Sequence, residues 1–172
     1  MFKMVGAILI IIGSGITGLI IARNYSLRPQ QIRYLRNGMQ MLETEILYGL
    51  TPLPEALRRI GQRLPFPIGQ FYLRTSELLT HGEGLPAFEA WEIALRDLED
   101  NSALLAEDLD ILYYFGQSLG GSDRQEQEKN LRLVLEQLRQ LEIKAEELKV
   151  KNKKLWQYLG FSLGAVVVLI LI

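Results

Sequence analysis

The stretch SDRQEQEKNLRLVLEQLRQLEIKAEELKVKNKKLWQYLGFSLGAVVVLILI, residues 122–172, predicts one unbroken helix. Ser122 and Gln125 have the spacing of a capping box, which marks a helix start. No glycine or proline interrupts the stretch before Gly160. A stripe of apolar residues, with one asparagine among them, recurs at alternating steps of three and four, as in a helix that packs on another helix. Its members are Leu131, Val134, Leu138, Leu141, Ala145, Leu148, Asn152, Leu155 and Leu159.

Two long uncharged segments lie near the two ends of the chain. Residues 155–172 carry no charge, and neither do the eighteen residues from Val5 to Ala22. Each is close to the roughly 20 apolar residues that cross a bilayer. We therefore expect three parts: an N-terminal transmembrane helix over 1–22, a domain over 23–154 whose last helix begins at about 122, and a C-terminal transmembrane helix over 155–172.

The first apolar segment has a competing interpretation as a cleaved signal peptide. Residues 1–3 would be its short basic leader, and the small residues 13–15 its cleavage site. Against this, the apolar run continues to Ala22 and is closed by Arg23, whereas a signal peptide becomes polar soon after cleavage. We expect a retained span.

Small residues in both predicted spans have the spacing that lets membrane helices approach closely. The alternative is that glycine is simply common in membrane helices. The candidate packing residues are Gly13 with Thr17, Ser14 with Gly18, and Gly160 with Gly164.

Charge is distributed unevenly between the spans. Residues 23–36 carry four arginines and no acid, whereas residues 37–122 carry thirteen acids against five arginines. Residues 123–154 carry nine bases against seven acids, with four lysines beside the apolar tail. Basic residues next to a span remain on the cytoplasmic side. The sequence therefore predicts an integral membrane protein with two spans and a cytoplasmic domain.

The central domain is predicted to be all-α, a bundle of about six helices joined by short loops. Pro29 sits in the first turn of the first helix, Thr51 caps the second, the third runs from about Pro67 to His81, Pro86 opens the fourth, and Asn101-Ser102 caps the fifth. The residues expected to face inward are Ile32, Leu35, Met39, Leu42, Ile46, Leu50, Ala56, Leu57, Ile60, Ile68, Phe71, Tyr72, Ser76, Leu78, Leu79, Ala87, Ala90, Trp91, Ala94, Leu95, Leu98, Leu105, Leu109, Leu112, Tyr113 and Phe115. The stripe on the last helix either packs on this bundle or forms a dimeric coiled coil with Asn152 setting the register.

Six acids surround the turn between the fourth and fifth helices, far in sequence from both predicted spans. A run of this kind is most often a solvated turn. The alternative is a docking surface for a basic partner, because charge of one sign steers association and suppresses wrong partners. The candidate partner-binding residues are Asp97, Glu99, Asp100, Glu107, Asp108 and Asp110.

No pattern in the sequence indicates catalysis or cofactor binding. The chain has no cysteine, which excludes disulfides and zinc-thiolate sites. Its single histidine, His81, lies four residues after Glu77, and two protein ligands make a poor metal site. Phosphate-binding glycine loops and catalytic serine contexts are not found. We expect neither an enzyme nor a nucleic-acid-binding protein, and no catalytic, cofactor or metal residues.

Three stretches together resemble the stage III sporulation protein AB family of endospore-forming bacteria. They are residues 42–57, with Tyr48-Gly49-Leu50-Thr51-Pro52-Leu53-Pro54-Glu55-Ala56-Leu57, then residues 119–123, and finally the Leu- and Lys-rich helix that leads into Leu159-Gly160. The soluble part also resembles the helical domain of type II secretion F proteins, through residues 50–57 and, loosely, residues 82–88. Those proteins carry a duplicated domain and three spans, whereas this chain has one domain and two predicted spans.

The resemblance implies a membrane platform without chemistry of its own. Its partner would be an ATPase like stage III sporulation protein AA, and the two would act with other sporulation channel subunits in the mother-cell-side membrane around the forespore. A homo-oligomer would restore the missing domain copy. The alternative function is a membrane-tethered helical adaptor or regulator that binds a soluble signalling partner, and recovery of an ATPase with the chain distinguishes the two.

Overall fold

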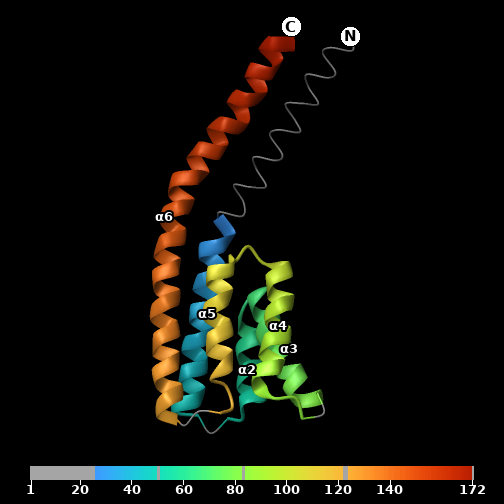
Figure 1. The fold of residues 1–172 in the computed structure, drawn as a ribbon, viewed down its shortest axis with the longest axis vertical. Coiled ribbons are helices and arrows are strands. Elements are labelled where there is room, and N and C mark those ends of the chain that lie inside the picture. Colours follow the sequence, from blue (N-terminus) through green and yellow to red (C-terminus); the bar gives the residue numbers. More distant parts are fainter. Residues whose placement is uncertain (1–25, 50, 83, 122–123, 172) are drawn as a thin grey trace. The chain divides into compact units, whose positions relative to one another are not determined.

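The computed structural model describes residues 26–49, 51–82, 84–121 and 124–171, and the side chains of residue 124 and of residues 153–171 are outside that description. This part of the chain holds six helices and no strand, which confirms the all-α prediction (Figure 1). The first helix covers residues 26–47. The others are α2 (Leu53–Arg63), α3 (Ile68–His81), α4 (Ala87–Asn101), α5 (Ala106–Gln117) and α6 (Arg124–Leu171).

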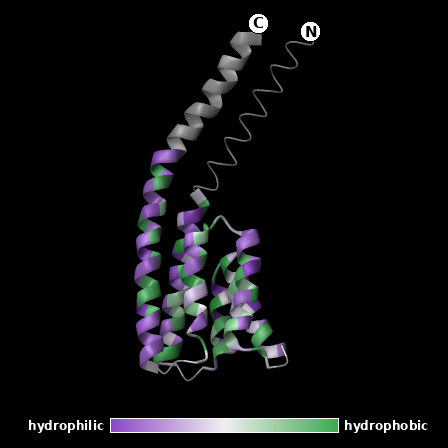
Figure 2. Cartoon of the chain, in the orientation of Figure 1, coloured by the Kyte–Doolittle hydropathy of each residue, from purple (hydrophilic) through white to green (hydrophobic). Residues whose placement is uncertain are grey.

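The chain divides into two compact units. Residues Gln30–Ile143 form one, and residues Met1–Pro29 with Lys144–Ile172 form the other. In the larger unit, helices joined in sequence run alongside one another, as expected for an antiparallel bundle (Figure 1). Hydrophilic and hydrophobic residues alternate around these helices, because each helix buries one face (Figure 2).

An aromatic cluster forms the centre of the larger unit. Trp91 of α4 is fully buried and meets Phe71 of α3 edge to face, with 4.6 Å between ring centroids. Phe115 of α5 packs on Trp91 in the same way at 5.5 Å, and Tyr72 packs on Phe71 at 5.0 Å. Such pairs stabilise a core beyond their buried area by about 0.5–1.5 kcal/mol each. The cluster therefore joins α3, α4 and α5.

Most residues expected to face inward are buried, and the exceptions are half-buried or lie in a turn. Leu105 is 49% exposed because it precedes α5 in the turn. Ile46, Leu78, Leu79, Ala87 and Tyr113 are half-buried, and Leu50 lies outside the described residues. Thr75 was not predicted to be inward but is fully buried, and its hydroxyl is satisfied there by donating to the Phe71 carbonyl at 2.9 Å.

One carboxylate joins the first helix to α6. Glu142 is only 9% exposed, and its Oε1 lies 2.7 Å from Arg33 Nε. Its Oε2 lies 2.9 Å from Arg36 Nη1. Within the described residues this second contact is an ion pair without hydrogen-bond alignment, because Glu142 Oε2 has no hydrogen-bond partner; Arg36 Nε is likewise buried without one.

Two predicted helix starts are wrong. The described part of the first helix begins at residue 26, so the first-turn position of Pro29 stays a prediction. The N-cap of α2 is Pro52, whose extended backbone carries no side-chain cap, in place of Thr51. The N-cap of α5 is Leu105, because Asn101 stays in α4 with its Nδ2 donating to the Asp97 carbonyl at 2.7 Å.

The long carboxyl-terminal helix is confirmed from residue 124 onward, since α6 continues without a break to Leu171. The predicted capping residue Ser122 lies outside the described residues. So do Gly13, Ser14, Thr17 and Gly18 of the first predicted span, and the surroundings of Gly160 and Gly164 in the second. Within the described residues, no helix combines the length and apolarity needed to cross a membrane. Both spans stay predictions.

Candidate interaction surface

The turn between α4 and α5 is held against the first helix by one side chain. Gln31 Oε1 accepts a hydrogen bond of 2.8 Å from the Ala103 N–H, across 72 residues of sequence. Gln31 is only 7% exposed, so water competes little for this bond. The turn therefore lies beside the amino-terminal part of the larger unit, although it is far from that part in sequence.

Asp108 is a structural residue of this turn. It has no exposed surface, and its Oδ2 accepts a hydrogen bond of 2.8 Å from the Leu105 N–H. This is the reciprocal half of a capping box, in which the third helical residue satisfies the amide of the N-cap. Burial therefore removes Asp108 from the surface that we expected to contact a partner.

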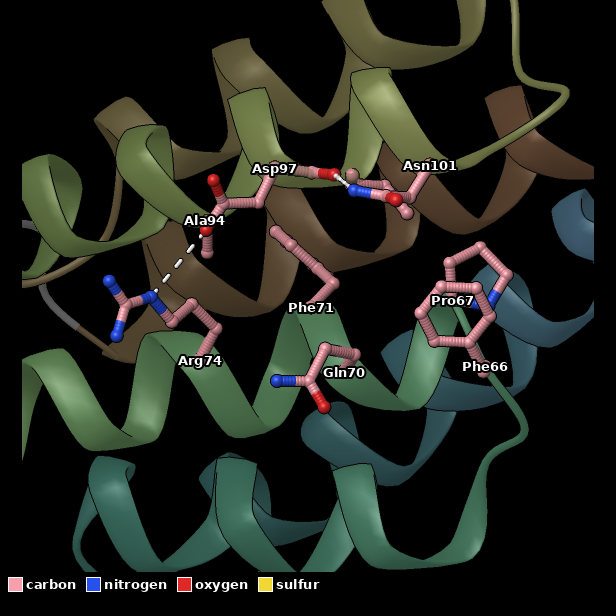
Figure 3. Close-up of a pocket in the computed structure, with 9 residues that line it drawn as sticks. Phe66, Pro67, Gln70, Phe71, Arg74, Ala94, Asp97 and Asn101 are labelled. Carbon is pink, nitrogen blue, oxygen red and sulfur yellow. Dashed lines mark hydrogen bonds and ion pairs between the residues drawn. The ribbon is translucent and has the colours of Figure 1, made fainter.

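Asp97 faces α3. Its Oδ2 lies 3.5 Å from Arg74 Nε, across a small pocket of about 50 Å³ between α3 and α4 (Figure 3). Both side chains are about half exposed, so the pair adds little to stability. The arginine nevertheless offsets the charge of Asp97.

Glu99 and Asp110 face a second groove, of about 220 Å³, between α4 and α5. Arg96 also lines this groove, but its Nη2 lies 2.7 Å from Glu92 Oε1. The hydrogen bond with Glu92 raises the pKa of Arg96. Because this cation is already paired, the groove presents mainly negative charge to a partner.

The six predicted acids therefore occupy three environments. Asp108 is buried, Asp97 is paired toward α3, and four residues form an exposed acidic corner around the turn. The acidic corner consists of Glu99, Asp100, Glu107 and Asp110. It belongs to a segment, residues 89–110, that carries eight acids and one arginine. Contact with a partner stays a prediction for these residues.

An apolar groove between α5 and α6 was not predicted from the sequence. This α5–α6 groove has a volume of about 420 Å³. Tyr114 is 68% exposed and Leu133 is 56% exposed along its walls, while Phe115 and Val134 are almost fully buried beneath them. The available signal was Leu133, an apolar residue that falls outside the buried stripe of the last helix.

Metal-ligating side chains are scattered through the described part of the chain. Among those residues there is no group of three or more that a metal ion would require. His81 is exposed at the end of α3, and its Nδ1 lies 3.3 Å from the Glu77 carbonyl oxygen. The Glu77 carboxylate pairs with Arg74 at 3.7 Å instead. His81 and Glu77 therefore do not combine their side chains in one site.

Known proteins match most or nearly all of this chain. Residues 3–172 match the family model described as stage III sporulation protein AB. A curated relative, stage III sporulation protein AB of Bacillus subtilis (strain 168), is 37% identical over 171 residues, which cover 99% of each chain. A solved structure of stage III sporulation protein AB is also 37% identical, with a TM-score of 0.69 over 73% of this chain and 98% of that one.

Proposed function

Because the chain belongs to the stage III sporulation protein AB family, we propose that it is a non-enzymatic membrane platform of the channel between mother cell and forespore. In this role it recruits a cytoplasmic secretion-type ATPase, similar to stage III sporulation protein AA, and works with other channel subunits. Family membership supports the role in sporulation. The role as a platform and the recruitment of an ATPase are supported by the features described below.

The acidic corner is the observation that carries the docking proposal. Glu99, Asp100 and Asp110 are exposed around one turn, and the nearby Arg96 is paired with Glu92. A basic surface on the partner would be attracted to this corner, and partners with acidic surfaces would be repelled. The hydrogen bond between Gln31 and Ala103 fixes the turn in place, so little ordering is needed on binding.

The membrane attachment rests on the two apolar segments, residues 5–22 and 155–172, and on the basic residues beside them. In this proposal the acidic corner belongs to the cytoplasmic domain, which is attached to the mother-cell-side membrane around the forespore. The ATPase would dock there.

Extraction of the full chain from sporulating cells tests this function. The platform predicts that the ATPase is recovered with the detergent-solubilised chain. A triple variant of the acidic corner, Glu99→Gln with Asp100→Asn and Asp110→Asn, should bind the ATPase about tenfold more weakly and with a flatter dependence on salt. The matched control, Glu77→Gln with Glu136→Gln and Glu147→Gln, removes three exposed charges elsewhere and should bind like the wild type.

The outcomes separate the platform from an adaptor. Wild-type chain recovered without any ATPase, but with a soluble signalling protein, would contradict the platform and favour the membrane-tethered adaptor. ATPase binding that is equal in the triple variant and the control would retain the platform and remove the acidic corner as its contact.

A further inference from the structure

The α5–α6 groove combines an apolar floor with two exposed apolar walls. Phe115 and Val134 are each 4% exposed and close the bottom of the groove. Tyr114 of α5 and Leu133 of α6 extend above them with more than half of their surface in water. Single exposed apolar residues are ordinary on a protein surface. Two of them over a common apolar floor form a contiguous patch, which is typical of a binding site.

The shape of the groove suits one helix. Its walls are two neighbouring helices, and the lining residues repeat at helical spacing on both: Ile111, Tyr114 and Phe115 on α5, with Asn130, Leu133, Val134 and Gln137 on α6. An amphipathic helix buries its apolar stripe in a groove of this kind through side chains spaced three and four residues apart. A third helix would complete a three-helix packing unit with α5 and α6.

The charge of the groove selects a basic occupant. Asp110 is its one ionisable lining residue apart from tyrosine, and no cation lines it. Asp110 also belongs to the acidic corner, so the groove continues directly into a negative surface. A lysine or arginine on the flank of the incoming helix would pair with Asp110 while the apolar residues are buried.

The exposed apolar area is too small for a second copy of this chain to be held here alone. An aromatic side chain buries about 150–250 Å² when it is fully covered, so Tyr114 and Leu133 together offer roughly 200–300 Å². A stable interface needs roughly 800 Å² from each partner. A single docked helix that also contacts the acidic corner fits this area better than a dimer built on the groove.

We infer that the α5–α6 groove receives a basic amphipathic helix of the ATPase that this protein recruits. Apolar side chains of that helix rest on Tyr114 and Leu133, and a lysine or arginine pairs with Asp110. This inference rests on the proposed function and names the docking face within it. The neighbouring α4–α5 groove is a poorer anchor, because Arg96 and Glu92 are already paired there and its tyrosine, Tyr113, is half-buried against Phe88.

The test compares groove and control variants of the full chain in detergent, with the purified stage III sporulation protein AA-like ATPase of the same organism as the probe. The groove variant is Tyr114→Ala with Leu133→Ala. The control variant is Phe66→Ala with Ile93→Ala, which truncates an exposed aromatic and an exposed aliphatic residue outside this groove. All four side chains are exposed, so thermal unfolding should be nearly unchanged and loss of binding would not reflect misfolding.

We expect the groove variant to raise the Kd at least tenfold, as for residues that dominate an interface, and the control variant to change it less than twofold. Equal Kd values for both variants and the wild type would overturn the groove and leave the platform intact. Loss of self-association in the groove variant, with unchanged ATPase binding, would assign the groove to a second copy and overturn the inference. Failure of the wild-type chain to bind the ATPase would overturn both proposals.

Discussion

Trp91 Nε1–H donates a hydrogen bond of 2.8 Å to the carbonyl oxygen of Leu112, and this bond ties α4 to α5 inside the core. The indole reaches that carbonyl by passing over Gly116, one turn further along α5. A β-carbon built on Gly116 would lie 2.5 Å from Trp91 Cδ1. The bare backbone of Gly116 therefore makes room for the tryptophan.

Replacement of Gly116 by alanine should destabilise the protein by about 1–3 kcal/mol, because the enclosed indole has to shift and its hydrogen bond is strained. The free energy of unfolding, measured with urea and followed by tryptophan fluorescence, checks this. The control is Gly121→Ala, since no atom lies within 4 Å of a β-carbon built there. Equal stabilities of the two variants would show that Gly116 does not limit the packing of Trp91.

Tyr72 should make the protein sensitive to alkali. Complete burial raises the pKa of Tyr72 above its ordinary value near 10. As the pH rises, the unfolded chain therefore loses the Tyr72 proton before the folded protein does. The free energy of unfolding keeps its full contribution from the protonated Tyr72 below about pH 10 and declines as the pH rises further. Between pH 8 and pH 11, the wild type should lose about 1.4 kcal/mol more of its unfolding free energy than Tyr72→Phe.

Tyr48→Phe provides the control for that comparison, because Tyr48 is 85% exposed. Its stability should depend on pH as that of the wild type does. A Tyr72→Phe profile that is parallel to the wild-type profile up to pH 11 would contradict the role of burial.

Asp108 should stabilise the protein by capping the start of α5. Asp108→Ala leaves the Leu105 amide without its acceptor and should cost about 1–2 kcal/mol, as for other helix caps. Asp108→Asn keeps an oxygen acceptor and should lose less. Thermal unfolding of both variants checks the order, and ATPase binding of Asp108→Asn should equal that of the wild type. An Asn variant that is as unstable as the Ala variant would contradict the cap.

Glu142 should stabilise the folded protein by pairing with Arg33 and Arg36. Glu142→Ala leaves Arg36 partly buried without a counterion. The expected cost is about 2 kcal/mol, below the roughly 3–5 kcal/mol of a fully enclosed pair, because Arg33 is half exposed. Urea unfolding measures it. Glu136→Ala, which breaks an exposed pair with Arg139 on α6, should leave the unfolding midpoint unchanged; a similar loss in both variants would refute a special role for Glu142.

Apolar spacing predicted the helices and most of the core because each helix buries one regular face. Proline and glycine located both ends of α3 and the start of α4 to within about one residue. The start of α5 was missed because its cap acts backward, from Asp108 to the Leu105 amide, whereas Asn101-Ser102 offered a more familiar signal. Local sequence does not reveal which of two capping options the chain adopts.

The candidate surface was predicted only in outline for a related reason. The run of acids is visible in the sequence, but which of them are exposed depends on contacts between helices. Arg74 of α3 pairs with Asp97, and the cap buries Asp108. The α5–α6 groove depends on how two helices pack, so Leu133 alone was a weak signal. The place of the turn beside Gln31 is likewise a tertiary contact.

The most direct test of a membrane platform is the accessibility of one introduced cysteine, since the natural chain has none. Gln117 is exposed at the end of α5 and accepts the substitution Gln117→Cys without loss of a core contact. Carbonate-washed membrane vesicles are treated with a maleimide that does not cross membranes. We predict labelling in inside-out vesicles and protection in right-side-out vesicles. Labelling in right-side-out vesicles, or removal of the chain from both preparations by the wash, would contradict a cytoplasmic platform anchored in the membrane.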